Sequence, residues 1–155
     1  MIPHVLVLAV GRGKGTEEQA LFDRYAARLR PVPRLVEIPE AKGSPAEIRR
    51  REGETVPRAL PAGADLIALD LGGEDLATEA FAGRLARLAE PGRTAALAIG
   101  GAEGLDRAVL DRAASILSFG RATWPHLLVR AMLAGQLYRA ASLLAGHPSH
   151  RAGRP

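Results

Sequence analysis

The chain has 155 residues, of which 47% are hydrophobic, and its 21 basic residues outnumber its 17 acidic residues. This length and composition fit one folded domain, residues 1–155, and exclude a chain that is disordered throughout. Cysteine is absent, which excludes disulfides, a thiol nucleophile and a cysteine-ligated zinc site.

Neither apolar segment of the sequence predicts insertion into a membrane. The N-terminal segment is short and follows no basic residues, so it indicates a buried strand rather than a signal peptide. The segment from Leu127 to Gly146 is interrupted by Arg130, Gln136 and Arg139, whereas a membrane span needs about 20 largely uncharged residues. We therefore expect a soluble cytoplasmic protein.

Apolar spacing, prolines and glycines predict strands and helices in alternation. The expected elements, in chain order, are a strand at 3–10, a helix from the cap Thr16 to Pro31, a strand at 34–38, a helix from Ser44 to Pro61, a strand at 65–71, a helix at 77–88, a strand at 94–99, a helix at 105–114, a strand at 115–119 and a helix at 127–145. This alternation predicts an α/β fold with a parallel sheet flanked by helices.

Glycines follow three of the predicted strands, at Gly11–Gly15, Gly72-Gly73 and Gly100–Gly104. In open α/β sheets, ligands bind beyond the carboxyl ends of the strands, and glycine allows a ligand to approach the backbone closely. Tight turns between strands and helices also use glycine. Each loop therefore leaves a binding role and a structural role open.

The first glycine loop fails both common phosphate-binding patterns at a defining position. A dinucleotide fingerprint requires a third glycine where Thr16 stands, although Glu37 occupies a place suited to a ribose-binding acid. A P-loop requires serine or threonine after Lys14, and Gly15 stands there. A nucleotide-dependent enzyme that uses NAD or ATP remains an alternative.

Charge is distributed unevenly along the chain. The segment from Arg112 to Pro155 contains six arginines and no acidic residue, whereas the first 111 residues carry a formal charge of −2. A basic end on a nearly neutral body indicates an anionic partner that meets one face. The alternative to an anionic partner is a general preference for arginine in this chain, because arginine supplies most of its basic residues.

The last predicted helix is apolar on nearly all sides, so it needs burial that a terminal helix of a single domain does not find within its own chain. We expect a homodimer interface there. Arg130 and Arg139 are nine residues apart and project on opposite sides of this helix, at about 100° per residue. Each needs an anion, a carbonyl or solvent, and two structural arginines with backbone partners remain possible.

The four histidines form no metal-binding pattern. His4 lies in the first predicted strand, and its expected role is structural. His126 begins the last helix, while His147 and His150 lie in the arginine-containing tail. Neither metal-ligand spacing nor a serine–histidine–aspartate arrangement is identifiable, so we expect no metal and no hydrolase chemistry.

The sequence resembles the bacterial 23S rRNA pseudouridine N3-methyltransferases of the SPOUT superfamily. The resemblance runs nearly end to end. The order and spacing of the matching segments agree with the family, as do the segments themselves. These segments are LAVGRGK, VEIPEAKG, LDLGGEDLATEAFA, AIGGAEGL, LSFGRATWPHLLVR and QLYRA.

The resemblance implies a SPOUT-type α/β fold whose C-terminal third forms a trefoil knot, binding of S-adenosylmethionine in that knot, and a homodimer. It also implies methylation of N3 of a pseudouridine in 23S rRNA. Carried over by position, the cofactor-binding residues would be Leu69, Gly100, Phe119, Gly120, Arg121, Ala122, Thr123 and Trp124.

The same resemblance implies that catalysis aligns the base with the methyl group, with a basic residue assisting loss of the N3 proton. The candidate catalytic residues are His126, Arg130, Arg139 and His150. Two positions depart from the family: the tail has Ser149 before His150 where the family has tyrosine, and Gly135 replaces a glutamate of the last helix.

RNA binding is expected to be mainly electrostatic, because aromatic residues make up only 4% of the chain. The expected phosphate contacts are Arg49–Arg51, Arg121, Arg151 and Arg154. Arg49–Arg51 also fit a solvated helix face paired with Glu52 and Glu54. The family resemblance implies that the substrate is 23S rRNA within the assembled ribosome. A methyltransferase of this fold acting on tRNA, or a non-catalytic RNA- or ribosome-binding module, remains an alternative.

Overall fold

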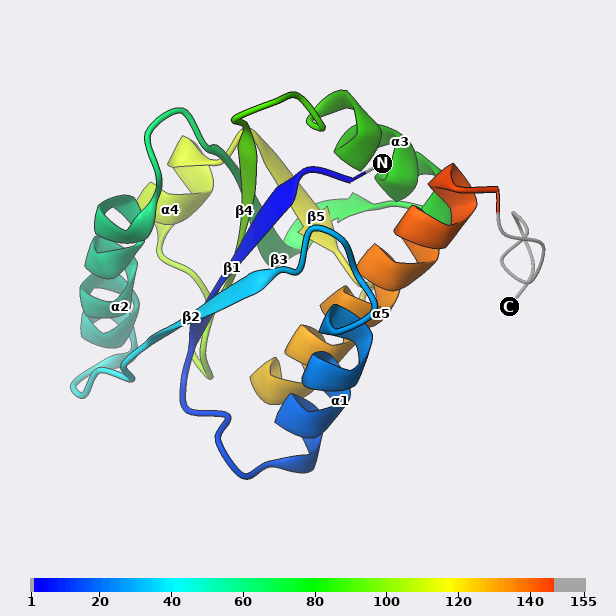
Figure 1. Cartoon of the computed structure of the whole chain (residues 1–155). Helices are drawn as coiled ribbons and strands as arrows, with labels where there is room; N and C mark the ends of the chain where they lie inside the picture. Colours follow the sequence, from blue (N-terminus) through cyan, green and yellow to red (C-terminus); the bar gives the residue numbers. More distant parts are fainter. Residues whose placement is uncertain (1, 147–155) are drawn as a thin grey trace.

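A computed structural model describes residues 2–146 of the chain as alternating strands and helices (Figure 1). The elements, in chain order, are β1 (His4–Val10), α1 (Glu17–Ala26), β2 (Arg34–Ile38), α2 (Pro45–Ala59), β3 (Asp65–Asp75), α3 (Thr78–Arg87), β4 (Thr94–Ile99), α4 (Arg107–Arg112), β5 (Ser115–Ser118) and α5 (His126–Leu144). The alternation predicted from the sequence is confirmed.

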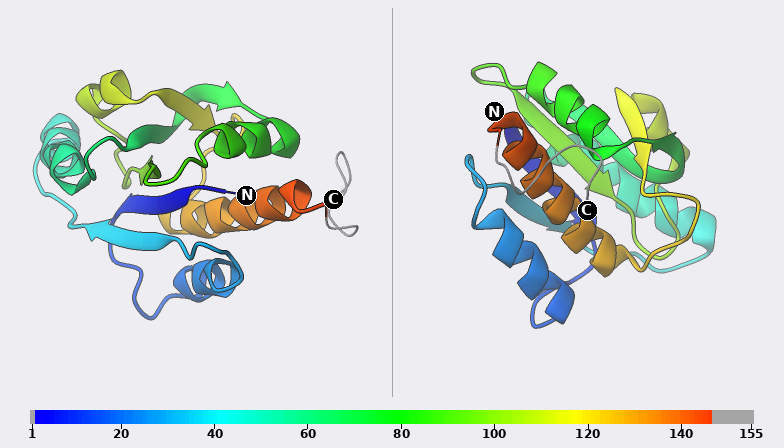
Figure 2. Two further views of the ribbon diagram at one scale, coloured as in Figure 1. Left: turned by 45° about the horizontal axis from the view of Figure 1, so that its top comes forward. Right: turned by 90° about the vertical axis from the view of Figure 1, so that its right-hand side faces the viewer.

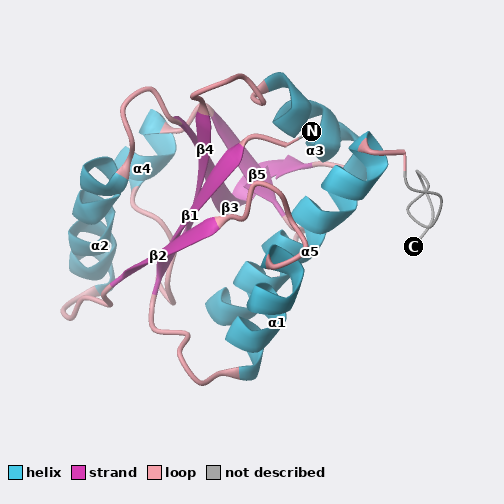
Figure 3. Cartoon of the chain, viewed as in Figure 1, coloured by secondary structure: helices cyan, strands magenta, loops and turns pink. Residues whose placement is uncertain are grey.

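The five strands form one parallel sheet in the order β2-β1-β4-β3-β5 (Figure 3). Because every strand runs in the same direction, the carboxyl ends of all five lie at one edge of the sheet. The loops that follow β1, β2, β4 and β5 therefore gather at that edge, although they are far apart in the sequence.

Helices cover both faces of the sheet, with α1, α3 and α5 on one face and α2 and α4 on the other (Figure 2). On the first face, Phe22, Leu85 and Leu137 pack in one buried apolar cluster. Val56 and Val109 belong to a second cluster on the opposite face. α5 packs against both α1 and α3, so the end of the chain returns to the middle of the first face.

Local sequence explains where the first two helices begin. The Thr16 hydroxyl accepts a hydrogen bond from the Gln19 amide and donates one to the Gly13 carbonyl at 2.6 Å. Ser44 and Glu47 form a reciprocal capping box at the start of α2, followed by proline at the first helical position. Both caps satisfy amides that a helix start leaves without intrahelical acceptors.

β3 differs from the expected strand, because it continues through Gly72-Gly73 to Asp75. Leu69 and Glu74 both pair with Leu117 of β5, so residues 70–73 form an insertion in the register. A Cβ at Gly73 would lie 2.7 Å from the backbone of Ile116 and Leu117. The prediction of a glycine turn after a strand at 65–71 was wrong, since Gly73 instead permits close approach of two strands.

The arginine run on α2 is only partly paired as expected. Arg50 lies 3.5 Å from Glu54, and Arg51 lies 3.4 Å from Glu47. Glu52 is buried, and its carboxylate accepts a hydrogen bond from the Ala41 amide. In the alternative of a solvated, paired helix face, the pairing with Glu54 is present but the pairing with Glu52 is wrong, because the Glu52 side chain is buried in the fold.

Among residues 2–146, no helix has both the length and the apolar character needed to cross a membrane. Of the residues named from the sequence, His147, Ser149, His150, Arg151 and Arg154 lie outside the described part of the chain.

Candidate active site

A hollow of about 390 Å³ opens at the carboxyl edge of the sheet, between the ends of β3, β4 and β5. We call it the central hollow. Its walls combine backbone from glycine-bearing loops with apolar and a few polar side chains. It is lined by Leu69, Asp70, Leu71, Ile99, Gly100, Gly101, Ala102, Glu103, Gly104, Leu117, Ser118, Phe119, Gly120, Ala122, Thr123, Trp124, His126 and Val129.

The turn after β4 forms one wall, and it depends on glycine. The Gly104 amide donates a hydrogen bond to the Gly101 carbonyl at 3.0 Å. A Cβ at Gly100 would lie only 2.6 Å from the carbonyl carbon of Gly104. Side chains are therefore excluded from the inside of this turn, and its backbone faces the hollow directly.

The loop between β5 and α5 forms the opposite wall. Gly120 has a positive φ of 94°, and its carbonyl accepts a hydrogen bond from the Ser118 hydroxyl. The Trp124 indole donates to the Phe119 carbonyl at 3.2 Å, yet this residue remains 45% exposed. The loop thus holds an aromatic ring at the rim of the hollow without burying it.

Seven of the eight residues predicted to bind the cofactor line this hollow. Arg121 is the eighth; it is exposed and does not belong to the lining. The sequence interpretation missed two lining carboxylates, Asp70 and Glu103. Each was detectable, because Asp70 directly follows the predicted site residue Leu69, and Glu103 lies within the glycine turn.

The three candidate catalytic residues within the described part of the chain are not brought together. His126 lines the central hollow, whereas Arg130, one turn later on α5, is completely buried. Arg139 lines a different hollow on the outer side of α5, which agrees with the expected opposite projection of the two arginines. His150 lies outside the described residues.

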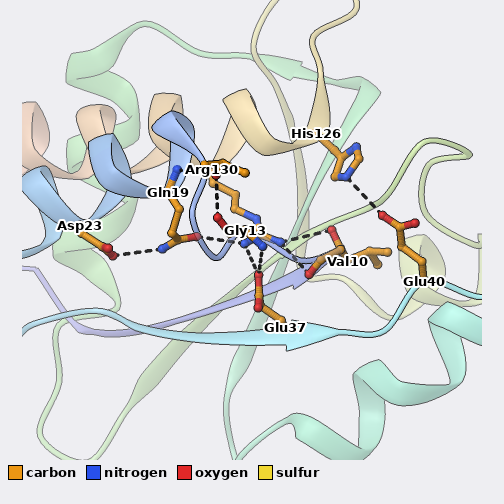
Figure 4. A network of polar contacts seen from close by, with 10 residues as sticks. Val10, Gly13, Gln19, Asp23, Glu37, Glu40, His126 and Arg130 are labelled. Atoms are coloured by element: carbon orange, nitrogen blue, oxygen red, sulfur yellow. Dashed lines mark hydrogen bonds and ion pairs between the residues drawn. The ribbon is translucent and has the colours of Figure 1, made fainter.

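Arg130 is the centre of a polar network that joins α5 to the ends of β1 and β2 (Figure 4). Its Nη1 donates to Glu37 at 2.6 Å and to Gln19 at 3.1 Å. Its Nη2 donates to the carbonyls of Val10 and Gly11 at 3.3 and 3.0 Å. The predicted partners of this arginine, an anion or carbonyls, are therefore both present.

Glu37 remains charged within this network. Burial acts to raise the pKa of Glu37, but hydrogen bonds from Arg130 and from the Gly13 amide outweigh it. The charges of Arg130 and Arg12 act in the same direction, so the pKa lies below its ordinary value. The carboxylate is thus available at neutral pH to fix the first glycine loop.

Within residues 2–146, no group of three or more histidine or acidic side chains is arranged to hold a metal ion.

The fold and the central hollow define a class: α/β proteins that bind an organic ligand against glycine-bearing loops at the carboxyl edge of a parallel sheet. The sequence matches the family described as predicted SPOUT methyltransferases over residues 4–150. The chain belongs to this SPOUT family and is a methyltransferase.

Two curated relatives are similar along almost the whole chain. Ribosomal RNA large subunit methyltransferase H of Acidiphilium cryptum is 54% identical over 149 residues, covering 96% of this chain and 94% of the relative. The protein of the same name from Gluconacetobacter diazotrophicus is 52% identical, covering 96% of this chain and 98% of the relative.

A solved structure supports the fold alone. A probable methylase family protein from Haemophilus influenzae Rd KW20 aligns with a TM-score of 0.55 and 11% identity. The alignment covers 94% of this chain and 68% of that one.

The residues of the central hollow fit a sulfonium methyl donor of the S-adenosylmethionine type, which membership of this family implies. Its volume lies within the range of ordinary ligand sites, roughly 300–1,000 Å³. Leu69, Leu71 and Trp124 offer apolar surface, and the glycine turn offers backbone hydrogen-bonding groups. Asp70 and Glu103 supply negative charge suited to the ammonium and sulfonium groups of such a donor.

Proposed function

We propose that this protein transfers a methyl group from S-adenosylmethionine to N3 of a pseudouridine in 23S rRNA, within the assembled ribosome. The observation that carries the proposal is the convergence of the predicted cofactor residues on one hollow. The names of the curated relatives, ribosomal RNA large subunit methyltransferases, support the substrate class.

The central hollow accounts for binding and alignment. S-adenosylmethionine, when bound, supplies a methyl group that is activated by attachment to a positively charged sulfur. The glycine turn 100–104 and the loop 119–124 would hold the cofactor, because both line the hollow. Holding the base in line with the methyl carbon is the main contribution expected from the protein.

The reaction requires that N3 of the base lose its proton as the nitrogen–methyl bond forms and the methyl–sulfur bond breaks. Of the candidate catalytic residues within 2–146, His126 lines the hollow and therefore lies nearest to this chemistry. An imidazole nitrogen at this place accepts the proton directly or through water. Arg139 and His150 remain candidates for holding the RNA or its developing negative charge.

Arg130 serves this proposal as a positioning residue. Its side chain is fully buried and its guanidinium is bonded to Glu37, Gln19 and backbone carbonyls. It fixes the start of α5, and with it His126, relative to the ends of β1 and β2.

The proposal includes the trefoil knot of the SPOUT family. The path of the chain supports it, because the segment after β5 turns back and α5 returns to the middle of the sheet. There Arg130 contacts Val10 and Gly11, residues about 120 positions earlier in the chain. Such a return brings loops 100–104 and 119–124 to one side of the sheet.

The proposal also includes a homodimer that acts in the cytoplasm, where ribosomes are found. A hollow of about 580 Å³ lies over α1 and α5, and its lining includes Leu21, Tyr25, Leu128 and Met132. This partly apolar surface supports a second copy as its cover. Light scattering of the purified protein should give the mass of a dimer, and a Met132→Glu variant should shift it toward the monomer.

The decisive experiment measures cofactor binding and methyl transfer on the same preparations. Calorimetric titration with S-adenosylmethionine should show binding to the wild type. Ala122→Phe, which fills the central hollow, should abolish it, and Trp124→Ala should weaken it about tenfold. Val32→Ala, an exposed apolar residue outside the hollow, is the matched control and should bind normally.

Transfer of a radiolabelled methyl group to purified ribosomes then tests the substrate. Label in 23S rRNA that is lost with Ala122→Phe supports the proposal. Label in tRNA but not in ribosomes would replace the proposed substrate. Absence of cofactor binding with or without ribosomes would refute S-adenosylmethionine as the ligand of the central hollow.

A further inference from the structure

A second hollow, of about 480 Å³, lies at the carboxyl ends of β1 and β2. We call it the β1–β2 hollow. It is lined by Gly11, Arg12, Glu37, Pro39 and Glu40. Its residues come from the two sequence segments LAVGRGK and VEIPEAKG. The proposed cofactor site uses no residue of either segment.

His126 stands between the two hollows. This residue lines the central hollow, and its Nε2 lies 3.8 Å from the Glu40 carboxylate of the β1–β2 hollow. Figure 4 shows the imidazole facing this carboxylate. A Cβ at Gly11 would lie 3.0 Å from His126 Nε2 and 3.3 Å from Glu40 Oε1. Glycine at position 11 thus leaves the space in which this pair meets.

Hydrogen bonds fix the backbone and the Glu37 side chain that line the β1–β2 hollow. Glu37 accepts hydrogen bonds from Arg130 at 2.6 Å and from the Gly13 amide at 2.7 Å. The Gly11 amide donates to the Ile38 carbonyl at 2.9 Å. These bonds connect both strand ends and α5, so the loop that presents Arg12 is fixed to the element that presents His126.

The groups left facing outward have opposite charges. Arg130 neutralises Glu37, whereas the Glu40 carboxylate is 64% exposed and Arg12 lies in the exposed part of the loop. An arginine favours a phosphate, and a carboxylate accepts hydrogen bonds from N–H donors. One nucleotide offers both groups, a phosphate and a base N–H.

We infer that the β1–β2 hollow receives the RNA nucleotide to be methylated, with Arg12 on a phosphate, Glu40 accepting a hydrogen bond from a base N–H, and His126 at the passage to the methyl donor. This inference rests on the proposed function, because it assigns the second substrate to a place beside the proposed cofactor site. It makes Glu40 a residue that determines which base is accepted.

The chemistry of the base gives Glu40 a specific consequence. Pseudouridine is joined to ribose through carbon and carries N–H groups at both N1 and N3, whereas uridine carries one at N3 alone. When N3 faces the methyl donor, N1–H is the donor that remains in pseudouridine. A carboxylate that accepts this hydrogen bond favours pseudouridine over uridine.

The test compares charge-matched variants on methylation of ribosomes, with S-adenosylmethionine binding measured in parallel by calorimetry. Arg12→Ala should raise the KM for ribosomes about tenfold, as the loss of one charge-assisted contact predicts. Lys14→Ala removes the same charge from the same loop but lies outside the lining, so its effect should be severalfold smaller. Both variants should bind S-adenosylmethionine like the wild type.

Glu40→Ala gives the sharper result, because simple repulsion of RNA and the proposed hydrogen bond predict opposite changes in kcat/KM. If the carboxylate only repels RNA, its removal strengthens binding and raises kcat/KM. The proposed site predicts instead that kcat/KM on ribosomes containing the target pseudouridine falls about tenfold or more. On ribosomes that carry uridine at that position the variant should change little, so the preference of the wild type for pseudouridine should collapse.

Three outcomes would overturn the inference: an increase in kcat/KM for Glu40→Ala, equal effects of Arg12→Ala and Lys14→Ala, or an unchanged preference between the two bases. A failure of the proposed function is distinguishable from these, since it appears as missing cofactor binding or missing methyl transfer in the wild type. Glu17→Gln, which changes an exposed carboxylate of α1, controls for a general effect of lost negative charge.

Discussion

The ends of β1 and β2 and the ends of β3, β4 and β5 lie at the same edge of one sheet, yet they are built differently. At β1 and β2, side-chain charges tie the backbone together through Arg130 and Glu37. At β4 and β5, the loops are shaped by glycines and by hydrogen bonds within each loop. Side-chain contacts fix the ends of β1 and β2. At the ends of β4 and β5, glycines leave the backbone of the loops open to a ligand.

This contrast suits a transfer between two substrates. In the proposed function, a cofactor in the central hollow would be recognised by loops whose backbone it can approach closely. In the inferred site, an RNA nucleotide in the β1–β2 hollow would meet charged side chains held in place by the ion pair between the buried Arg130 and the partly exposed Glu37. The difference predicts that variants at the ends of β1 and β2 act mainly on stability and RNA use, and variants at the ends of β4 and β5 mainly on cofactor binding.

The largest expected effect is that of Arg130→Met. Its loss removes one donor from the Glu37 carboxylate, which keeps the Gly13 amide, and removes the donor from two backbone carbonyls. Because the Glu37 side chain is 35% exposed, the cost is smaller than for a fully buried pair, about 2–3 kcal/mol. Urea denaturation should show this decrease in the free energy of unfolding. Arg58→Met, an exposed arginine of α2, should change it by less than about 0.5 kcal/mol. Equal effects of the two variants would refute a central role for the network.

Gly100→Ala should have the next largest effect, and it should fall on the cofactor. The added Cβ would meet the backbone of Gly104, and the turn must open at a cost of about 1–3 kcal/mol. We expect calorimetry to show at least a tenfold loss of S-adenosylmethionine affinity. Gly83→Ala on α3 meets no atom within 4 Å and should bind normally. Wild-type affinity in Gly100→Ala would show that the turn is not part of the site.

Glu37→Gln should give a smaller effect that depends on pH. The folded protein lowers the pKa of Glu37 below its ordinary value of 4.5, so its charge stabilises the fold above that pH. The stability gap between wild type and variant should be full near pH 7 and should close as pH falls below 4.5. Unfolding free energies measured across this range check the sign, and a gap that widens in acid would contradict it.

The smallest effect is expected for Glu54→Gln, which removes the exposed pair with Arg50. Both side chains are more than half exposed, and such helix pairs contribute only about 0.3–0.5 kcal/mol. The change in urea midpoint should be near the limit of measurement and should vanish in high salt. A larger effect would mean that the contrast between buried and exposed pairs is overstated.

Much of the fold followed from local patterns. The caps at Thr16 and Ser44, the prolines and the period of the apolar residues placed the ten elements correctly to within a few residues. The exception was β3, whose continuation past Leu71 depends on the neighbouring strand β5. Considered alone, the pair Gly72-Gly73 predicts a turn. Next to β5, Gly73 instead allows the backbones of two strands to approach closely.

The sites were predicted unevenly for a similar reason. Seven residues chosen by motif matching line the central hollow. Most of them are neighbours in the loop 119–124, so placing the loop places them together. Motif matching gave no reason to separate Arg130 from His126, since both belong to the same motif and lie one helical turn apart. Only the position of α5 over the sheet buries one side chain and leaves the other at the hollow.

The sequence by itself determined the class of fold, the family and most of the loop residues that line the central hollow, because these depend on residue type, spacing and order along the chain. The tertiary structure alone decided which charges meet. Glu37 and Arg130 are 93 residues apart, and Glu40 and His126 are separated by a similar distance along the chain. Their pairing depends on parallel strands ending at one edge and on α5 returning across it, which no local pattern specifies.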